Sequence, residues 1–305
     1  MGISIFFILI ISLIFPGIIA TTKAKVAGKK GPVVLQVFYD NIRLLKKGSI
    51  YSKTTSFIFQ IAPVVYFSTI MVSTFFIPFG HHEALLSFDG DFILFAYILA
   101  LGKFFTIIAA MDTGSGFEGM GANREAYYSM LVEPAFFIII ASLALLTNNT
   151  SFHDLFNSLH IQSELSIFTS AIAVYVILWI AMVENSRLPV DDPKTHLELT
   201  MVHEVMVLDY SGFDLALIQL ANGIKFTIYG ALIFNFIMPN NLSWITLIIS
   251  FILIQIGFAI STGLLESFKA RHKMMKNPQW IVSLSVIAII AFFSVIIITS
   301  KIILI

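Results

Sequence analysis

Cysteine is absent from this chain of 305 residues. The protein therefore forms no disulfide bond, offers no thiol nucleophile and supplies no thiolate ligand, so any iron–sulfur cluster that it works with must belong to another subunit. Charged residues are scarce at 12%, and Lys+Arg and Asp+Glu are equal at 18 each. Such a chain has no overall field that would attract nucleic acid, and we expect no nucleic-acid partner.

Hydrophobic residues make up 58% of the sequence, and they gather into long uninterrupted blocks. A helix of about 20 apolar residues crosses the hydrocarbon core of a membrane, whereas the strands of a membrane barrel would alternate apolar and polar residues. About eight such helices and their loops account for nearly the whole chain, so we predict an all-α integral membrane protein with a single multi-pass domain over residues 1–305. The predicted spans are residues 3–20, 56–79, 91–111, 127–147, 165–184, 214–238, 242–265 and 280–303.

The loops between the predicted spans differ in charge, because their basic residues occur in alternate loops only. The loop between the first two spans carries eight Lys and Arg residues, whereas the loops near residues 80–90, 148–164 and 239–241 carry none. Because Lys and Arg accumulate on the cytoplasmic side, we predict that both termini lie outside and that the basic loops lie in the cytoplasm. A cleaved signal peptide over residues 1–20 is the alternative, but its positive charges would precede the apolar run, and here they follow it from Lys23 onward.

One cytoplasmic loop carries the signals of a helix of its own. Asp192 can cap a helix that has Pro193 at its first position, and Gly212 offers a stop. The sequence therefore predicts an amphipathic helix against the membrane face, with a plain connecting helix as the simpler alternative. Its apolar stripe is Leu197, Met201, Val205 and Leu208.

Three ionisable residues, Lys103, Glu133 and Lys225, fall well inside the predicted spans. A charged side chain at bilayer depth costs roughly 2.5 to 3.5 kcal/mol, so such residues face a protein interior or a wet cavity and often mark ion routes. A structural ion pair is the alternative. Further acids close the cytoplasmic ends of the spans, and like charges in a low-dielectric site raise at least one pKa, which suits groups that exchange protons near neutral pH. These acids are Asp112, Glu118, Glu125, Glu184 and Glu266.

Two sequence blocks carry a family resemblance. The first contains Asp112-Thr113-Gly114-Ser115, Gly119-Met120-Gly121, Arg124-Glu125 and Glu133-Pro134; the second reads ENSRLPVDDP at residues 184–193 and THLELTM at residues 195–201. They resemble the membrane subunit shared by formate hydrogenlyase, energy-converting nickel–iron hydrogenases and, more distantly, complex I, where it is the ND1 protein. Gly114, Gly116, Gly119 and Gly121 are expected to form a tight, close-packed loop, since no strand precedes them and no Lys-Ser/Thr pair follows as in a phosphate-binding loop.

The resemblance implies a non-catalytic, proton-conducting membrane anchor of an oxidoreductase complex in the cell (inner) membrane. It implies a cluster-bearing small subunit and a nickel-bearing large subunit on the cytoplasmic face, antiporter-like membrane subunits alongside, surrounding lipid and no cofactor in this chain. The alternative is the ND1-type subunit of NADH-quinone oxidoreductase, contributing to a quinone cavity; the missing arginine-rich quinone loop counts against it. The expected proton-path residues are Glu133, Glu184, Glu198, Glu204, Lys103 and Lys225, and the expected cavity and docking residues are Asp112, Glu118, Arg124, Arg187, Asp191 and Asp192.

Three other functions fit the sequence less well. A haem-bearing anchor needs axial histidines at membrane depth, and all seven histidines lie outside the predicted spans. A stand-alone secondary transporter could use buried Lys and Glu residues, but no inverted repeat is apparent. An independent catalyst is the weakest alternative, because no nucleophile–base set, metal-ligand spacing or nucleotide loop stands out.

Overall fold

The computed structural model describes residues 3–159, 164–192, 201–239 and 242–303. In these ranges the chain is helical without strands, and eight helices are long and apolar enough to cross a membrane, which confirms the predicted fold class. The side on which the termini lie stays a prediction. The helices are α1 (Ile3–Val26), α2 (Gln36–Leu45), α3 (Phe57–Ser73), η1 (Thr74–Phe76), α4 (Asp91–Asp112), α5 (Gly116–Thr147), α6 (Phe152–Leu159), α7 (Glu164–Glu184), α8 (His203–Met206), α9 (Gly212–Ile237), α10 (Trp244–Phe268), η2 (Met274–Lys276) and α11 (Asn277–Ile303).

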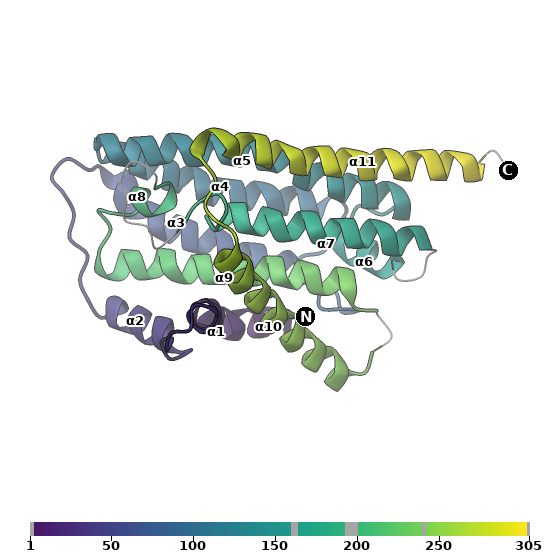
Figure 1. Cartoon of the computed structure of the whole chain (residues 1–305), viewed down its shortest axis with the longest axis horizontal. Coiled ribbons are helices and arrows are strands. Elements are labelled where there is room, and N and C mark those ends of the chain that lie inside the picture. The colour runs from purple at the N-terminus through teal and green to yellow at the C-terminus, as the bar shows by residue number, and fades with distance from the viewer. Residues whose placement is uncertain (1–2, 160–163, 193–200, 240–241, 304–305) are drawn as a thin grey trace.

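Six of the long helices run side by side along the longest axis of the molecule, as Figure 1 shows for α3, α4, α5, α7, α9 and α11. Helices α1 and α10 lie at a steep angle to this set, and both pack against α9. The short helices α2 and α8 lie at one end of the bundle and α6 lies at the other. We refer to these ends as the α8 end and the α6 end.

Helix α9 is the most enclosed of the eight spans, with 83% of its most apolar window buried. Small residues let its neighbours approach its backbone closely. A Cβ atom at Gly230 would overlap the side-chain amide of Gln255 on α10, and this amide donates a hydrogen bond of 3.0 Å to the carbonyl oxygen of Thr227. Most polar side chains in the middle of α9, among them Lys225, Thr227 and Asn235, are therefore buried against protein.

Helix α5 is longer than the sequence predicts. It begins at Gly116 instead of residue 127 and has 32 residues, so it is about 48 Å long and outreaches a hydrocarbon core of about 30 Å. The expected glycine loop is therefore wrong for Gly116, Gly119 and Gly121, which are helical. Close packing is found at Gly121 alone of the four glycines: a Cβ atom there would overlap Val205 and lie 2.7 Å from the carbonyl oxygen of Val202.

The predicted amphipathic helix is shorter in the described part of the chain. Residues 193–200, which include its proposed start, lie outside the described residues. Beyond them, only His203–Met206 form a helix, α8, in which Val205 and Met206 are buried. Val205 and Met206 pack against Gly121 of α5, so this segment is a folded loop with one helical turn at the end of the bundle.

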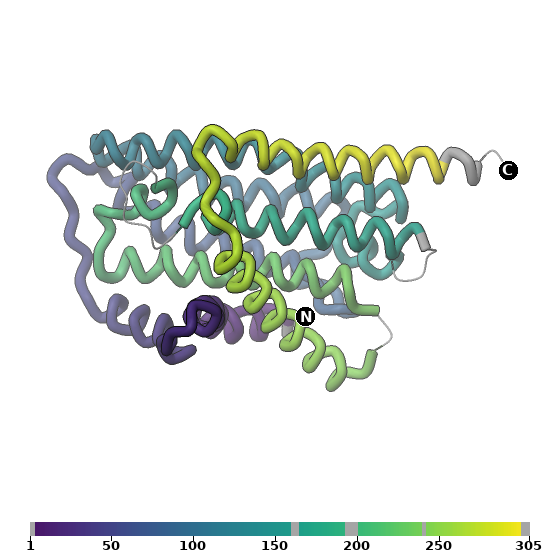
Figure 2. Tube along the Cα trace, in the orientation of Figure 1, coloured from purple at the N-terminus to yellow at the C-terminus, as the bar shows by residue number. Residues whose placement is uncertain are grey.

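The segment between α2 and α3 runs across the α8 end of the bundle, as the tube in Figure 2 shows. Its contacts tie it to the start of α9. The backbone N–H of Ile50 donates to Oγ of Ser211 at 3.1 Å, and the hydroxyl of Tyr51 donates to Oδ2 of Asp214 at 2.7 Å. This hydrogen bond to Asp214, together with burial, raises the pKa of Tyr51.

Candidate functional site

A buried network of four charged side chains joins four helices near the middle of α4 and α9. Lys103 on α4 donates to Oε1 of Glu184, the last residue of α7, at 2.8 Å. The same ammonium lies 3.1 Å from Oε1 of Glu125 on α5. Lys225 on α9 lies 2.7 Å from Oε2 of Glu184. The order of contacts is therefore Glu125, Lys103, Glu184, Lys225, and the four formal charges sum to zero.

The polar atoms of this network are well satisfied. Lys103 also donates to the hydroxyl of Ser129 at 2.7 Å, so its three donors reach three acceptors. Lys225 donates to the backbone carbonyl of Glu184 at 2.8 Å and so caps the end of α7. The side chains of Lys225 and Glu184 are only 2% and 11% exposed. Buried charges tolerate such a site only when they are paired and hydrogen-bonded, and this condition is met here.

A cavity of about 430 Å³ is lined by Asn185, Ser186 and Arg187, the residues that directly follow Glu184. It lies between α1, α2, α9 and the loop after α7, and it is lined by polar groups that include Arg187, Glu204 and Asn222. Nδ2 of Asn222 lies 3.2 Å from Nε2 of His203, which also lines the cavity. On its other side, Asn222 accepts a hydrogen bond of 2.6 Å from the hydroxyl of Tyr66 on α3.

Tyr66 lies beyond Asn222, away from this cavity. The side chain of Tyr66 is buried, and Asn222 is its hydrogen-bond partner. Asn222 and Lys225 are three residues apart on α9, so they lie on one face of that helix. The polar groups from His203 through Asn222 to Tyr66 therefore lead from the cavity into the bundle, and Asn222 lies one helical turn from Lys225, which contacts Glu184.

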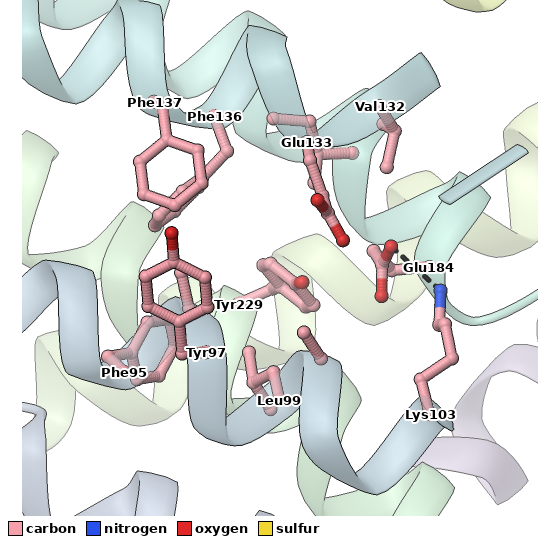
Figure 3. A pocket seen from close by; sticks show the side chains of 13 residues that line it. Phe95, Tyr97, Leu99, Lys103, Val132, Glu133, Phe136, Phe137, Glu184 and Tyr229 are labelled. Carbon is pink, nitrogen blue, oxygen red and sulfur yellow. Dashed lines mark hydrogen bonds and ion pairs between the residues drawn. The ribbon is translucent and has the colours of Figure 1, made fainter. Parts of the chain in front are cut away.

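A second, smaller cavity of about 60 Å³ is bordered by Glu184 itself. Lys103, Glu184, Tyr229 and Glu133 supply its polar groups, as Figure 3 shows. The rest of its wall is mostly apolar and includes several aromatic rings. In the described part of the chain, no hydrogen bond or ion pair reaches the carboxylate of Glu133, which is exposed at the surface of the bundle.

Three further ion pairs surround the loop after α7, and two of them involve residues of the loop itself. Glu266 on α10 lies 2.7 Å from Lys23 on α1 and 3.4 Å from Arg187. Asp191 lies 2.7 Å from Arg271 and accepts the backbone N–H of His203 at 3.1 Å. Burial raises the pKa of Asp191, while the backbone hydrogen bond and Arg271 act in the opposite direction.

The structure brings together four of the six residues that we expected in the proton path. Lys103, Glu184 and Lys225 are in direct contact, and Glu133 shares the small cavity with the first two. Glu204 lines the larger cavity instead. Glu198 lies outside the described residues.

The expected cavity and docking residues are more dispersed. Of the six, Arg187 alone lines the larger cavity. Three others make contacts that stabilise the α8 end: Asp112 accepts the backbone N–H of Ser56 at 2.7 Å, Glu118 accepts that of Asp209 at 3.3 Å, and Arg124 donates to the carbonyl oxygen of Met201 at 3.0 Å. Asp191 and Asp192 lie in the loop after α7, where the backbone N–H of Asp192 donates to Oδ1 of Asp191 at 2.9 Å.

Several polar groups of the site were not among the expected path residues. They are Glu125, Ser129, Tyr66, Asn222 and Tyr229. The sequence contains a signal for the first two, because Glu125, Ser129 and Glu133 are four residues apart and so share one face of α5. That signal was hidden because the span was predicted to begin after Glu125.

Comparison with known proteins agrees with this architecture. A family model described as NADH dehydrogenase matches residues 1–299. The chain belongs to this family. Among curated relatives, hydrogenase-4 component C of Escherichia coli K12 is 28% identical over 232 residues, which cover 76% of this chain and 72% of that protein. Formate hydrogenlyase subunit 4 of the same organism is 27% identical over 196 residues, which cover 64% of this chain and 63% of that protein.

The NADH dehydrogenase family fold is also seen in a solved complex. A chain of the membrane-bound sulfane sulfur reductase, an archaeal respiratory membrane complex, matches with a TM-score of 0.81 at 16% identity, over 95% of this chain and 96% of that one. At this identity the likeness concerns the fold. The resemblance drawn from the two sequence blocks is confirmed: this NADH dehydrogenase family member is homologous to membrane subunits of hydrogenase-4 and formate hydrogenlyase.

Proposed function

We propose that this chain is the membrane anchor and proton-path subunit of a respiratory complex of the hydrogenase or formate hydrogenlyase type, in the cell (inner) membrane. It couples electron transfer in its partner subunits to ion translocation. The partners are a cluster-bearing small subunit and a nickel-bearing large subunit at the α8 end, which is the cytoplasmic end, and antiporter-like subunits in the membrane. Iron–sulfur clusters and the nickel–iron site belong to these partners. The names of the two curated relatives support this assignment.

One observation carries the proposal: Glu184, held by two buried lysines, borders the smaller cavity, and the residues that follow it, Asn185 to Arg187, line the larger one. Asn222 in the larger cavity lies one helical turn from Lys225, and Glu133 borders the smaller cavity together with Glu184. An ion pair that served stability alone would need neither cavity. A hydrated route through otherwise apolar helices is what proton transfer requires.

The charge balance of the network indicates how a proton is relayed. Glu125, Lys103, Glu184 and Lys225 sum to zero. A proton delivered to Glu184 adds one positive charge in a site with little water. This charge favours ionisation of Glu133 across the small cavity, so a proton enters at Glu184 and another leaves from Glu133.

Proton pumping by the assembled complex in inverted membrane vesicles tests the proposal. Glu133→Gln removes a group that must bind and release a proton without breaking an ion pair, so proton uptake should be lost while electron transfer to the acceptor continues. Glu184→Gln should lose proton uptake as well, and because it also breaks a buried ion pair, its uptake is compared per unit of electron transfer. Glu83→Gln is the matched control, because this exposed glutamate lies in the turn at the α6 end. Full pumping by the Glu133→Gln/Glu184→Gln double variant would refute the proposal.

Quinone binding is the second candidate function, and the larger cavity favours it. Its volume of about 430 Å³ falls within the range of small-molecule sites, about 300 to 1,000 Å³, and Phe15 and Phe226 supply apolar walls. A quinone analogue that protects a cysteine introduced at Asn222 from maleimide would support this role. Unchanged labelling at saturating analogue would exclude it.

A further inference from the structure

A groove on the outer surface of the bundle lies between α4 and α5. Its volume is about 440 Å³, and its lining includes Tyr97, Lys103, Phe104, Met130 and Glu133. Tyr97, Phe104 and Met130 are 63%, 55% and 61% exposed. Glu133 and Lys103 also line the small inner cavity, so the groove reaches from the membrane side to the charged network.

The groove continues along α5 toward the α8 end. A second hollow of about 410 Å³ shares Ala126 with it and extends to Gly119 and Gly116. A Cβ atom at either glycine would meet nothing within 4 Å. This face of α5 is formed by residues spaced three or four apart, which are Gly116, Gly119, Asn123, Ala126, Met130 and Glu133. Small residues on one helix face allow the backbone of another membrane helix to approach closely.

Charge identifies what covers this face. The two lysines at membrane depth are bound inside the network, where they balance Glu125 and Glu184. In the described part of the chain, no cation forms an ion pair with Glu133, although this acid is exposed at membrane depth; Lys103 lines the same groove but is held by Glu125 and Glu184. Acyl chains cannot satisfy a carboxylate, and a second copy of this face would bring another Glu133 against the first.

We propose that a transmembrane helix of a neighbouring subunit lies in this groove and presents a lysine or histidine to Glu133. The inference rests on the proposed function in taking Glu133 as the exit of the path, and it names the group that receives the proton. The helix packs closely at Gly119 and carries its basic residue level with Glu133, 14 residues further along α5, or about 21 Å away.

Site-specific photo-crosslinking in the native complex tests this inference, because the chain has no cysteine of its own. Single variants Gly119→Cys and Met130→Cys are labelled with a maleimide benzophenone in membranes and irradiated. Leu253→Cys on α10, 63% exposed like Met130, is the control. We expect both groove positions to crosslink to the same membrane subunit, which is seen as a gel shift. The two crosslinked sites should lie about 11 residues apart on one helix of that subunit, with a lysine or histidine within one turn of the site that Met130→Cys labels.

Other outcomes overturn the inference. Adducts with lipid alone, with a second copy of this chain, or with the same peptide at Leu253→Cys would each do so, as would a partner helix without a lysine or histidine at that level. The proposed function fails separately. If no partner helix is captured but Glu133→Gln still stops pumping, the proposed proton path stands and only the docking inference is refuted. If the helix is captured and Glu133→Gln pumps normally, the proposed path is wrong, and so is the inferred proton transfer to the helix.

Discussion

Removing the charge of Glu184 should destabilise the protein strongly, and removing Lys225 as well should restore much of the loss. In the described part of the chain, both hydrogen bonds of the Lys225 ammonium go to Glu184, one to its carboxylate at 2.7 Å and one to its carbonyl at 2.8 Å. Glu184→Gln therefore leaves a lysine of 2% exposure without a counter-charge. Breaking a buried pair in this way costs about 3 to 5 kcal/mol.

The double variant Glu184→Gln/Lys225→Met has a different charge balance. Lys103 and Glu125 remain in contact at 3.1 Å and neutralise each other, so no buried charge lacks a partner. The double variant should therefore be more stable than Glu184→Gln alone, with an interaction energy at the upper end of the usual range of about 0.5 to 3 kcal/mol. Lys225→Met alone should cost less than Glu184→Gln, because Glu184 keeps Lys103.

Thermal unfolding of the purified chain in nanodiscs, followed by tryptophan fluorescence, measures these differences. Glu133→Gln is the matched control: it too removes a carboxylate at membrane depth, but this one has no partner in the described part of the chain. Its melting temperature should stay close to that of the unchanged chain. If the double variant loses the sum of the two single losses, the network is not the coupled unit that we describe.

The remaining predictions concern the α8 end. Gly121→Ala should displace the loop around Val205 and increase the cleavage of this loop by protease. Gly119→Ala should leave the isolated chain unaffected or stabilise it by up to about 1 kcal/mol. Equal cleavage of the two variants would contradict the packing argument. Tyr51→Phe should remove a stabilising contribution that is present at neutral pH and is lost at alkaline pH. Because the hydrogen bond to Asp214 raises the folded-state pKa of Tyr51, its contribution is complete below the ordinary tyrosine pKa of about 10 and is lost as the pH rises through the raised value. Unfolding measured between pH 8 and about 11 should show a shallower decline in the variant, and an unchanged slope would contradict this.

The membrane spans could be predicted well because their physical signal is local. Twenty apolar residues in sequence suffice to cross lipid, and each of the eight predicted spans overlaps a helix of the structure. The start of α5 could not be predicted in the same way. Its first turns contain Gly116, Gly119 and Gly121, which weaken a helix on propensity alone. Contacts of Gly121 and Arg124 with the α8 loop, which is distant in the sequence, favour the helix here.

The residues of the site that are most expensive to bury in the membrane could be predicted from the sequence. Lys103 and Lys225 are conspicuous in the sequence because a lysine at membrane depth requires a partner. Which acid each lysine contacts depends on how four helices are rotated against one another, and hydropathy contains no such information. Tyr66 and Asn222 were missed for a related reason, since a neutral polar residue in an apolar span costs little and is common where helices pack.

Asn222 and Lys225 lie on the most enclosed helix of the bundle, α9. A helix that faces lipid must direct any charged side chain toward the protein interior, so its polar residues contact neighbours on one side only. Helix α9 is buried over most of its length, and Asn222 and Lys225 on one of its faces contact α3, α7 and the α8 loop together. A movement of the α8 loop is therefore transmitted through His203 and Asn222 to a residue one turn from the Lys225–Glu184 pair. If electron transfer in a docked partner moves that loop, the contact of His203 with Asn222 is where the motion reaches the path, and His203→Ala should uncouple pumping from electron transfer while leaving the four-charge network in place.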